Sequence, residues 1–212
     1  MIELGLKFTA AYLIGSLLGS LIVGYLRGGV DIRKLGSGNP GGTNALRTQG
    51  KWFAVWVMLI DVGKGIAAVT ILPTLNLLGL PIDPAVSRDL ILYSVAFAAI
   101  LGHVYPLWYD FKGGKGGATA IGILCVLAPR VAAGVILLWI VIIALTGFVG
   151  LATMTGAIAA AVFVGATGLP EQSGLFAFTA ATAALIVYTH RSNIRRMREG
   201  TEVRMGMLRR PK

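Results

Sequence analysis

Long, almost uncharged apolar stretches alternate along this chain with short polar segments rich in glycine and basic residues. Lipid offers no partners for backbone hydrogen bonds, so a chain crosses it either as helices or as a closed barrel. A barrel would require short strands that alternate between polar and apolar residues, and the sequence lacks that alternation. The pattern therefore predicts an all-α polytopic membrane protein.

The apolar stretches predict about seven transmembrane helices in a single domain, residues 1–212. Three spans are expected near residues 4–26, 52–72 and 89–107. Residues 118–188 then have to be divided at about 20 residues per span. We expect four spans there, the first of them short, with breaks near residues 129–130, 147–150 and 168–174. Basic residues in the loops and tail favour a cytoplasmic side, so the N-terminus is expected outside and the C-terminus in the cytoplasm.

Composition agrees with this class of protein. The chain is 56% apolar and only 13% charged, about half the charge of an average soluble domain. Its net charge of +10 would suggest nucleic acid in a soluble protein. Here the basic residues lie in glycine-rich loops and in the tail, where membrane topology accounts for them. We therefore expect membrane lipid as a partner and no nucleic acid.

The first glycine-rich loop, residues 35–47, has the composition of a phosphate-binding segment. Glycine reaches positive φ and allows the backbone to approach a ligand closely. Successive N–H groups in such turns converge on an anion, and Arg47 adds a guanidinium. Its candidate ligand-binding residues are Ser37, Gly38, Asn39, Gly41, Thr43, Asn44 and Arg47.

Two features nearby have competing interpretations. The spacing of Gly36, Gly38 and Gly41 also fits a dinucleotide-binding fingerprint. That fingerprint requires a preceding strand and a βαβ unit, whereas membrane-length apolar stretches flank it here. Farther on, Asp61 and Lys64 share one helical face at membrane depth. A structural ion pair is favoured for them, with direct substrate contact as the alternative.

The second glycine-rich loop places Lys112 and Lys115 among four glycines, directly before an apolar helix. A glycine turn that leads into a helix N-terminus binds anions through unpaired N–H groups. The alternative is a flexible hinge. His103, shortly before this loop, has two possible roles: it accepts a hydroxyl proton or it holds the loop.

The basic tail predicts a helix at the membrane edge, where His190, Asn193 and Met197 recur at helical spacing. Such helices commonly bind anionic lipid headgroups. For His190 and Asn193 we favour a role in a site. Thr153 is expected near the cytoplasmic mouth of the last spans and is a further candidate substrate-binding residue.

Three segments together resemble the bacterial acyl-phosphate:glycerol-3-phosphate acyltransferase family (PlsY): residues 36–44, 102–116 and 190–204. One departure is Asp110, where a small residue is common. The resemblance implies a seven-span enzyme of the bacterial inner membrane with a cytoplasmic active site. It also implies transfer of an acyl group from acyl phosphate to the 1-hydroxyl of glycerol 3-phosphate. The products are lysophosphatidic acid and phosphate, in the first acylation step of phospholipid synthesis.

Neither a cofactor nor a metal is expected, because phosphate is already a good leaving group and positioning with charge stabilisation suffices. Catalytic roles are expected for Ser37, Arg47, His103, Lys112 and Lys115. Substrate-binding roles are expected for Gly38, Asn39, Gly41, Thr43, Asn44, Thr153, His190 and Asn193. Within this set, the loop around Ser37 is assigned to acyl phosphate. The cations, with His190 and Asn193, are assigned to glycerol 3-phosphate. The proton acceptor is either His103 or a substrate phosphate oxygen.

A transporter of an organic phosphate or another small anion is the main alternative function, since glycine-broken helices also occur in transporters. Against it, the polar segments are predicted on one side of the membrane and the sequence shows no inverted repeat. A lipid-binding scaffold is a third possibility, but it would not need two glycine-rich loops. Acyl-chain preference and oligomeric state are left open.

Overall fold

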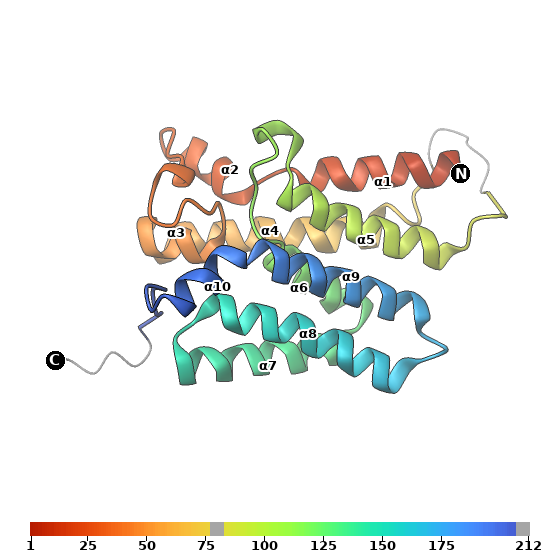
Figure 1. The fold of residues 1–212 in the computed structure, drawn as a ribbon. Helices are drawn as coiled ribbons and strands as arrows, with labels where there is room; N and C mark the ends of the chain where they lie inside the picture. The colour runs from red at the N-terminus through yellow and green to blue at the C-terminus, as the bar shows by residue number, and fades with distance from the viewer. Residues whose placement is uncertain (77–82, 207–212) are drawn as a thin grey trace. The chain divides into compact units, whose positions relative to one another are not determined.

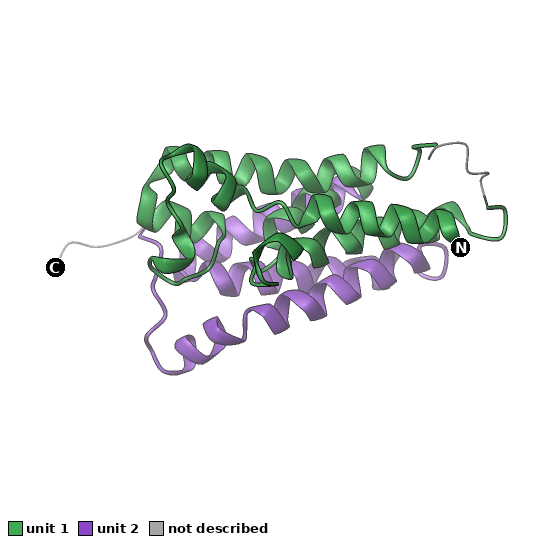
Figure 2. Ribbon diagram, turned by 90° about the horizontal axis from the view of Figure 1, so that it is seen from above, with its two compact units in different colours: residues 1–127 green, residues 128–212 purple. Residues whose placement is uncertain are grey.

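A computed structural model describes residues 1–76 and 83–206, and its regular elements are helices throughout that part of the chain (Figure 1). The all-α prediction is confirmed. Two compact units divide the chain, residues 1–127 and 128–212 (Figure 2). The first unit contains α1 (Ile2–Gly15), α2 (Gly19–Leu26), η1 (Ile32–Lys34), α3 (Gly42–Gln49), α4 (Lys51–Ile71), α5 (Arg88–Val104), η2 (Leu107–Tyr109) and α6 (Gly117–Leu127). The second contains α7 (Pro129–Thr146), α8 (Val149–Gly168), α9 (Ser173–Thr189) and α10 (Arg191–Arg198).

Helical segments occur at each of the seven predicted positions within the described residues. In residues 1–76 and 83–206, four helices are long and apolar enough to cross a membrane, and up to six segments qualify if each bent pair, α1–α2 and α9–α10, counts as one span. The remaining segment, α6, has 11 residues. At 1.5 Å per residue it is much shorter than the hydrocarbon core of a bilayer. The seven-span count and the orientation of the termini stay predictions.

The first span differs from its prediction, because residues 4–26 do not form one continuous helix. The chain bends by 46° between α1 and α2. Leu18 is extended at this break, and the Ser16 hydroxyl donates to the Tyr12 carbonyl one turn back. Serine bonds of this kind bend helices. The polar backbone groups at the break are bonded by side chains of α4, which the local sequence does not reveal.

Glycines bring the helices of the first unit into close backbone contact. A β-carbon at Gly15 would overlap the backbone of Ala99 on α5, and one at Gly102 would overlap that of Tyr12 on α1. A β-carbon at Gly122 of α6 would similarly overlap the Val62 carbonyl on α4. Small residues permit this approach in lipid, where packing rather than the hydrophobic effect holds helices together.

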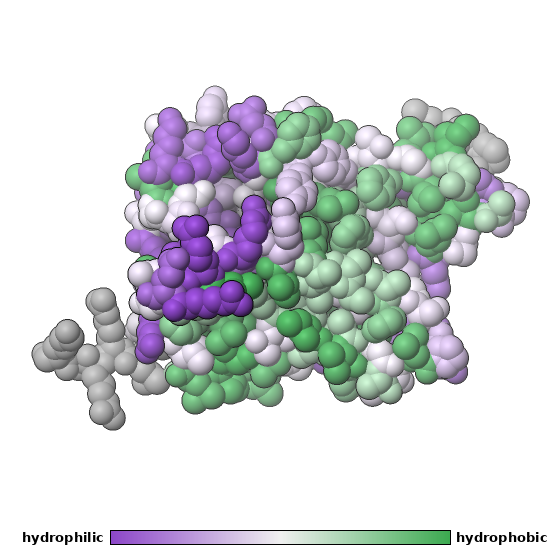
Figure 3. Space-filling view, viewed as in Figure 1, coloured by the Kyte–Doolittle hydropathy of each residue, from purple (hydrophilic) through white to green (hydrophobic). Residues whose placement is uncertain are grey.

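The second unit packs α8 against both α7 and α9. Its surface over α7 and α8 is largely hydrophobic, whereas the surface over α10 is hydrophilic (Figure 3). Leu137, Ile140 and Leu145 are among the exposed apolar side chains of α7. This distribution suits helices that face lipid and a basic helix that faces the membrane surface.

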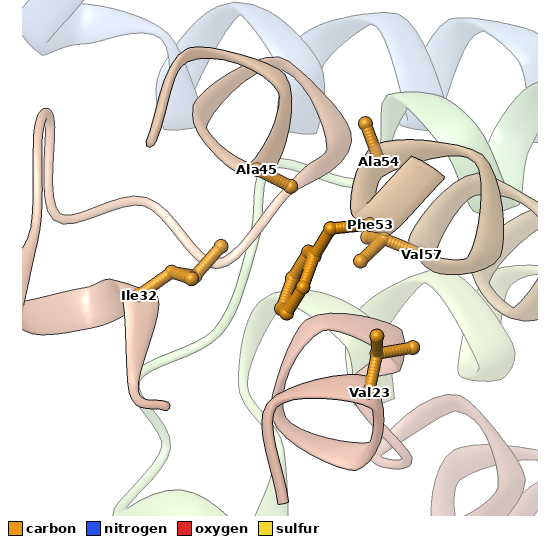
Figure 4. Packing of buried hydrophobic residues seen from close by; sticks show 6 residues of the cluster. All are labelled: Val23, Ile32, Ala45, Phe53, Ala54 and Val57. Atoms are coloured by element: carbon orange, nitrogen blue, oxygen red, sulfur yellow. The ribbon is translucent and has the colours of Figure 1, made fainter. Parts of the chain in front are cut away.

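A hydrophobic cluster supports the first glycine-rich loop. The Phe53 ring of α4 lies between Val23 of α2 on one side and Ile32 with Ala45 on the other (Figure 4). Ile32 belongs to η1 and Ala45 to α3, and both are fully buried. The cluster therefore fixes both ends of the loop on α2 and α4.

A separate ionic cluster joins the beginnings of α1 and α5. Lys7 donates to Glu3 at 2.8 Å and to the carbonyl of Pro73 at 2.7 Å. Arg88 forms two hydrogen bonds with the Glu3 carboxylate, at 2.8 and 3.0 Å. Within the first unit, this cluster lies at the opposite ends of α1 and α5 from the glycine-rich loops (Figure 1).

Candidate active site

Asn44 organises the first glycine-rich loop. Its side-chain amide is almost fully buried and donates to the carbonyls of Ile32 and Leu35, at 3.1 and 3.0 Å. Its oxygen accepts a hydrogen bond of 3.0 Å from the backbone N–H of Ser37. Asn44 was predicted to bind substrate. In the structure its side chain holds the loop backbone on both sides of Gly36, and its role in substrate binding stays a prediction.

The donors that this loop presents to a ligand belong mainly to the start of α3. Within the loop, Gly38 N–H bonds to the Leu35 carbonyl and Gly41 N–H to the Asn39 carbonyl, at 3.0 and 2.9 Å. Gly41 is the N-cap of α3 and makes no side-chain cap. The first N–H groups of a helix have no partner inside the helix, so the first turn offers Gly42 and Thr43 amides for an anion.

The candidate side chains of this loop lie around that helix start. Ser37 is exposed, Asn39 and Thr43 are half-buried, and Gly38 adopts φ 71°. Arg47 follows on α3 and is exposed. The structure thus brings the predicted first-loop residues together on one short segment, supported from below by the cluster around Phe53.

The second glycine-rich loop is bound to the end of α5. Gly113 N–H donates to the Val104 carbonyl at 3.1 Å, and Gly114 N–H to the His103 carbonyl at 3.0 Å. A β-carbon at Gly114 would overlap the His103 imidazole. The loop is therefore a fixed turn rather than a hinge. Lys112 is exposed and Lys115 is half-buried, immediately before α6 begins at Gly117.

The two loops approach each other within the first unit through Arg33 and Tyr109. The Arg33 guanidinium carbon lies 5.7 Å from the centre of the Tyr109 ring. Asp31 binds the same guanidinium through Nε and Nη2, at 3.0 and 2.8 Å. This bonding holds the pKa of Asp31 below its usual range and raises that of Arg33. Arg33 thus links the segment that leads into the first loop with the turn that leads into the second.

His103 lies beneath the second loop, with only 2% of its surface exposed. Its Nδ1 is 2.8 Å from Nζ of Lys64 and 3.5 Å from Oδ1 of Asp61. Of the two roles that the sequence left open, this geometry favours holding the loop over accepting a substrate proton, because the ring is enclosed by protein groups.

Asp61 and Lys64 form the buried ion pair that their spacing predicted. Lys64 Nζ donates to Asp61 Oδ1 at 2.9 Å, and both side chains are at most 5% exposed. The Thr119 hydroxyl of α6 donates to the Asp61 carbonyl at 3.0 Å, which joins α6 to the same turn of α4.

In the second unit, His190 and Asn193 occupy the junction of α9 and α10 and are both buried. His190 Nδ1 lies 2.7 Å from the Ile186 carbonyl, so this nitrogen carries a proton. Asn193 donates to Glu202 Oε1 at 2.7 Å, and Glu202 Oε2 accepts from Arg196 at 2.6 Å. Glu202 was not predicted as a site residue. The sequence feature that could have identified it is an acidic residue in a basic tail.

Thr153 of α8 accepts a 3.2 Å hydrogen bond from the Trp139 indole of α7. Its hydroxyl also donates to the Val149 carbonyl at 2.9 Å. It is half-buried, and these contacts join two helices of the second unit. Its predicted substrate-binding role stays a prediction, as do the roles of the other candidate residues.

Known proteins resemble the chain along nearly its whole length. The family model described as glycerol-3-phosphate acyltransferase matches residues 6–200. A glycerol-3-phosphate acyltransferase of Methylobacillus flagellatus is 40% identical over 197 residues, which cover 93% of this chain and 94% of the relative. One from Neisseria meningitidis serogroup B is 40% identical over 196 residues, with 92% and 94% covered.

Two crystal structures of PlsY (YgiH), an integral membrane glycerol 3-phosphate acyltransferase, have the same fold. The glycerol 3-phosphate form aligns with a TM-score of 0.83 and the lysophosphatidic acid form with 0.81. Each is 36% identical in sequence and covers 97% of this chain and 96% of the other. With the family model and the curated relatives, these matches show that this integral membrane protein belongs to the glycerol-3-phosphate acyltransferase family.

Proposed function

We propose that this protein transfers a fatty acyl group from acyl phosphate to the 1-hydroxyl of glycerol 3-phosphate. The hydroxyl oxygen attacks the acyl carbon, the bond from that carbon to the phosphate oxygen breaks, and lysophosphatidic acid and inorganic phosphate leave. The observation that carries this proposal is the pair of glycine-rich loops in the first unit. Each loop runs into a helix N-terminus, and Arg33 and Tyr109 join the segments before them.

Both substrates carry a phosphate group, and the two loops offer suitable partners. The first turn of α3 presents backbone N–H groups beside Ser37, and Arg47 supplies a guanidinium that binds phosphate with two parallel hydrogen bonds. Lys112 and Lys115 supply compact charges before α6. We assign the first-loop segment around Ser37 to the acyl phosphate. The cations Arg47, Lys112 and Lys115, together with His190 and Asn193, are assigned to glycerol 3-phosphate.

Acyl phosphate needs little activation, so catalysis rests on orientation and on stabilising charge at the carbonyl oxygen and the leaving phosphate. We assign the hydroxyl proton to an oxygen of the leaving phosphate. Support for this assignment comes from His103, whose ring is enclosed by Lys64 and the second loop. The reaction then proceeds without a histidine base.

We place the enzyme in the bacterial inner membrane, with the two loops facing the cytoplasm and the fatty chain of the donor in contact with lipid. The basic residues Arg33, Lys34 and Arg47 around the first loop support this orientation. Glycerol 3-phosphate is water-soluble, so a site at the cytoplasmic surface admits it directly.

The test uses purified full-length protein in detergent, with palmitoyl phosphate and radiolabelled glycerol 3-phosphate. We expect lysophosphatidic acid and inorganic phosphate in equal amounts, and no lysolipid when palmitoyl coenzyme A replaces the donor. Ser37→Ala and Arg47→Ala should each lower kcat/KM by about a hundredfold, the scale of a lost charge-assisted contact in a transition state.

Three results would contradict the proposal. One is uptake of glycerol 3-phosphate into proteoliposomes without lysolipid, which favours the transporter. Another is turnover near the wild-type level in both variants, which removes the first loop from catalysis. The third is efficient use of palmitoyl coenzyme A, which contradicts the assigned donor.

A further inference from the structure

At the break between α1 and α2, two backbone groups form hydrogen bonds with the side chains of one ion pair on α4. Where the helix stops, the Leu17 carbonyl accepts from Lys64 Nζ at 2.7 Å. Where the next helix begins, the Gly19 N–H donates to Asp61 Oδ1 at 3.1 Å. Asp61 and Lys64 also bond to each other at 2.9 Å. The pair therefore satisfies an acceptor and a donor that a broken helix leaves unpaired.

From this break, one connection runs to the first glycine-rich loop. Ser20, the residue after Gly19, is fully buried and its hydroxyl donates to the Pro40 carbonyl at 3.0 Å. Pro40 lies between Asn39 and Gly41, directly before α3. Asp61 thus fixes the start of α2, and the start of α2 holds the loop backbone where donors for an anion begin.

A second connection runs from Lys64 to the other glycine-rich loop. Three acceptors surround the ammonium: Asp61 Oδ1, the Leu17 carbonyl and His103 Nδ1. An ammonium group has three N–H donors, so Nδ1 of His103 accepts and the imidazole is neutral, with its proton on Nε2. The ring then packs against Gly114, whose N–H bonds to the His103 carbonyl.

We propose that Asp61 and Lys64 are positioning residues for acyl transfer. From inside the membrane they hold both glycine-rich loops, one through Ser20 and the other through His103. This inference rests on the proposed function, because it uses the assignment of acyl phosphate to the segment around Ser37 and of glycerol 3-phosphate to Lys112 and Lys115. The pair is poorly suited to stabilisation alone, since Asp61 Oδ2 is buried and has no hydrogen-bond partner in the part of the chain that the structure describes.

The first test replaces the pair by apolar residues of similar size, Asp61→Leu with Lys64→Met. Removing both charges avoids leaving one of them buried and unpaired, so the variant is expected to fold. We expect the KM values for palmitoyl phosphate and for glycerol 3-phosphate to rise about tenfold each, because both loops lose their anchor. Monodispersity by size exclusion and a thermal unfolding curve establish that the variant is folded.

The matched control is Glu3→Leu with Lys7→Met. This second buried ion pair also lies in the first unit, but at the far ends of α1 and α5 from the loops (Figure 1). It shows what the loss of a buried pair, together with the two hydrogen bonds from Arg88 to Glu3, does away from the loops. Both KM values should stay within twofold of the wild-type values.

Two single variants separate the connections. Ser20→Ala removes the bond to Pro40, and we expect a three- to tenfold rise in KM for palmitoyl phosphate only. His103→Phe keeps a ring against Gly114 but loses the acceptor for Lys64. For this variant we expect a similar rise in KM for glycerol 3-phosphate only.

Wild-type activity is measured first, and its absence defeats the proposed function rather than this inference. With an active wild type, the inference is overturned if the apolar pair leaves both KM values unchanged. It is also overturned if the Glu3 and Lys7 control raises them equally, because the effect then reflects general packing. The assigned connections are overturned if Ser20→Ala raises KM for glycerol 3-phosphate and His103→Phe raises KM for palmitoyl phosphate.

Discussion

Asn193 donates its side-chain amide to Glu202 across a turn of the basic tail, at 2.7 Å, and Arg196 binds the other oxygen of the same carboxylate. Glu202→Gln should therefore destabilise the protein by about 2 kcal/mol, since the carboxylate is buried and bonds a cation. It should also lower activity by misplacing Asn193. Thermal unfolding and KM for glycerol 3-phosphate measure the two effects.

Glu199→Gln is the matched control for that change. Its partner Arg195 is 3.6 Å away and both side chains are largely exposed. Exposed pairs contribute about 0–1 kcal/mol, so stability and kinetics should be close to those of the wild type. Equal effects of the two substitutions would contradict a special role for Glu202.

Gly114→Ala should weaken binding of glycerol 3-phosphate, because the new methyl group would overlap the His103 ring and displace the loop that carries Lys112 and Lys115. Overpacking of this kind costs about 1–3 kcal/mol. Gly134→Ala is the control: it lies inside α7 with open space around it, and it should raise stability by up to about 1 kcal/mol. An active Gly114→Ala enzyme with unchanged KM would show that the loop tolerates the shift.

Asn44→Ala should loosen the first glycine-rich loop, since three backbone groups lose their partner. We expect a loss of about 2–4 kcal/mol and a higher KM for acyl phosphate. Thr48→Ala, one turn along α3, removes a hydroxyl that donates within its own helix, at 2.9 Å to the Asn44 carbonyl. Its effect should stay within about 1 kcal/mol.

The ion pair of Asp31 with Arg33 predicts a pH dependence of stability. Because hydrogen bonds from Arg33 lower the pKa of Asp31 in the folded protein, the pair stabilises the fold above the usual pKa of aspartate. This contribution is lost as the pH falls through the lowered value. Asp31→Asn should thus be less stable than the wild type at pH 7, by up to about 1 kcal/mol, and the difference should shrink below about pH 4. A constant difference in denaturation curves across this range would contradict the assignment.

Cysteine labelling tests the proposed membrane side of the loops. The chain has a single cysteine, Cys125, so a Cys125→Ala background leaves no competing thiol. In that background, Ser37→Cys and Lys115→Cys should both react with a membrane-impermeant maleimide in inside-out vesicles and neither in intact cells. Labelling from opposite sides would exclude a common site for the two loops.

Hydrophobicity was sufficient to predict most spans, because lipid requires long apolar helices. Helix α4 was expected at 52–72 and occupies Lys51–Ile71, and the predicted breaks near residues 129, 147 and 168 separate the observed helices. The bend in the first span was missed. Its glycines and serines indicated close packing, but the backbone groups Gly19 N–H and Leu17 C=O at the bend bond to Asp61 and Lys64, which lie 42 and 47 residues farther along the chain.

The candidate site was predictable where local sequence determines local geometry. The glycines at positive φ follow from composition, whereas the short helix α3, which begins at Gly42 inside the predicted loop, was not predicted. Composition does not predict the direction in which a side chain points. Whether the Asn44 amide meets a ligand or the loop, and whether His103 meets a substrate or Lys64, depends on packing between distant segments. Glu202 was overlooked for the same reason.

The bend between α1 and α2 also has a consequence for how the protein is made. Until α4 is made, neither Asp61 nor Lys64 is beside the first span, and lipid cannot bond the Leu17 carbonyl or the Gly19 amide. We therefore expect the segment to enter the bilayer as a straight helix during synthesis and to bend once α4 lies beside it. Assembly of the candidate site is then expected to begin with the second span, when Asp61 and Lys64 reach the bilayer.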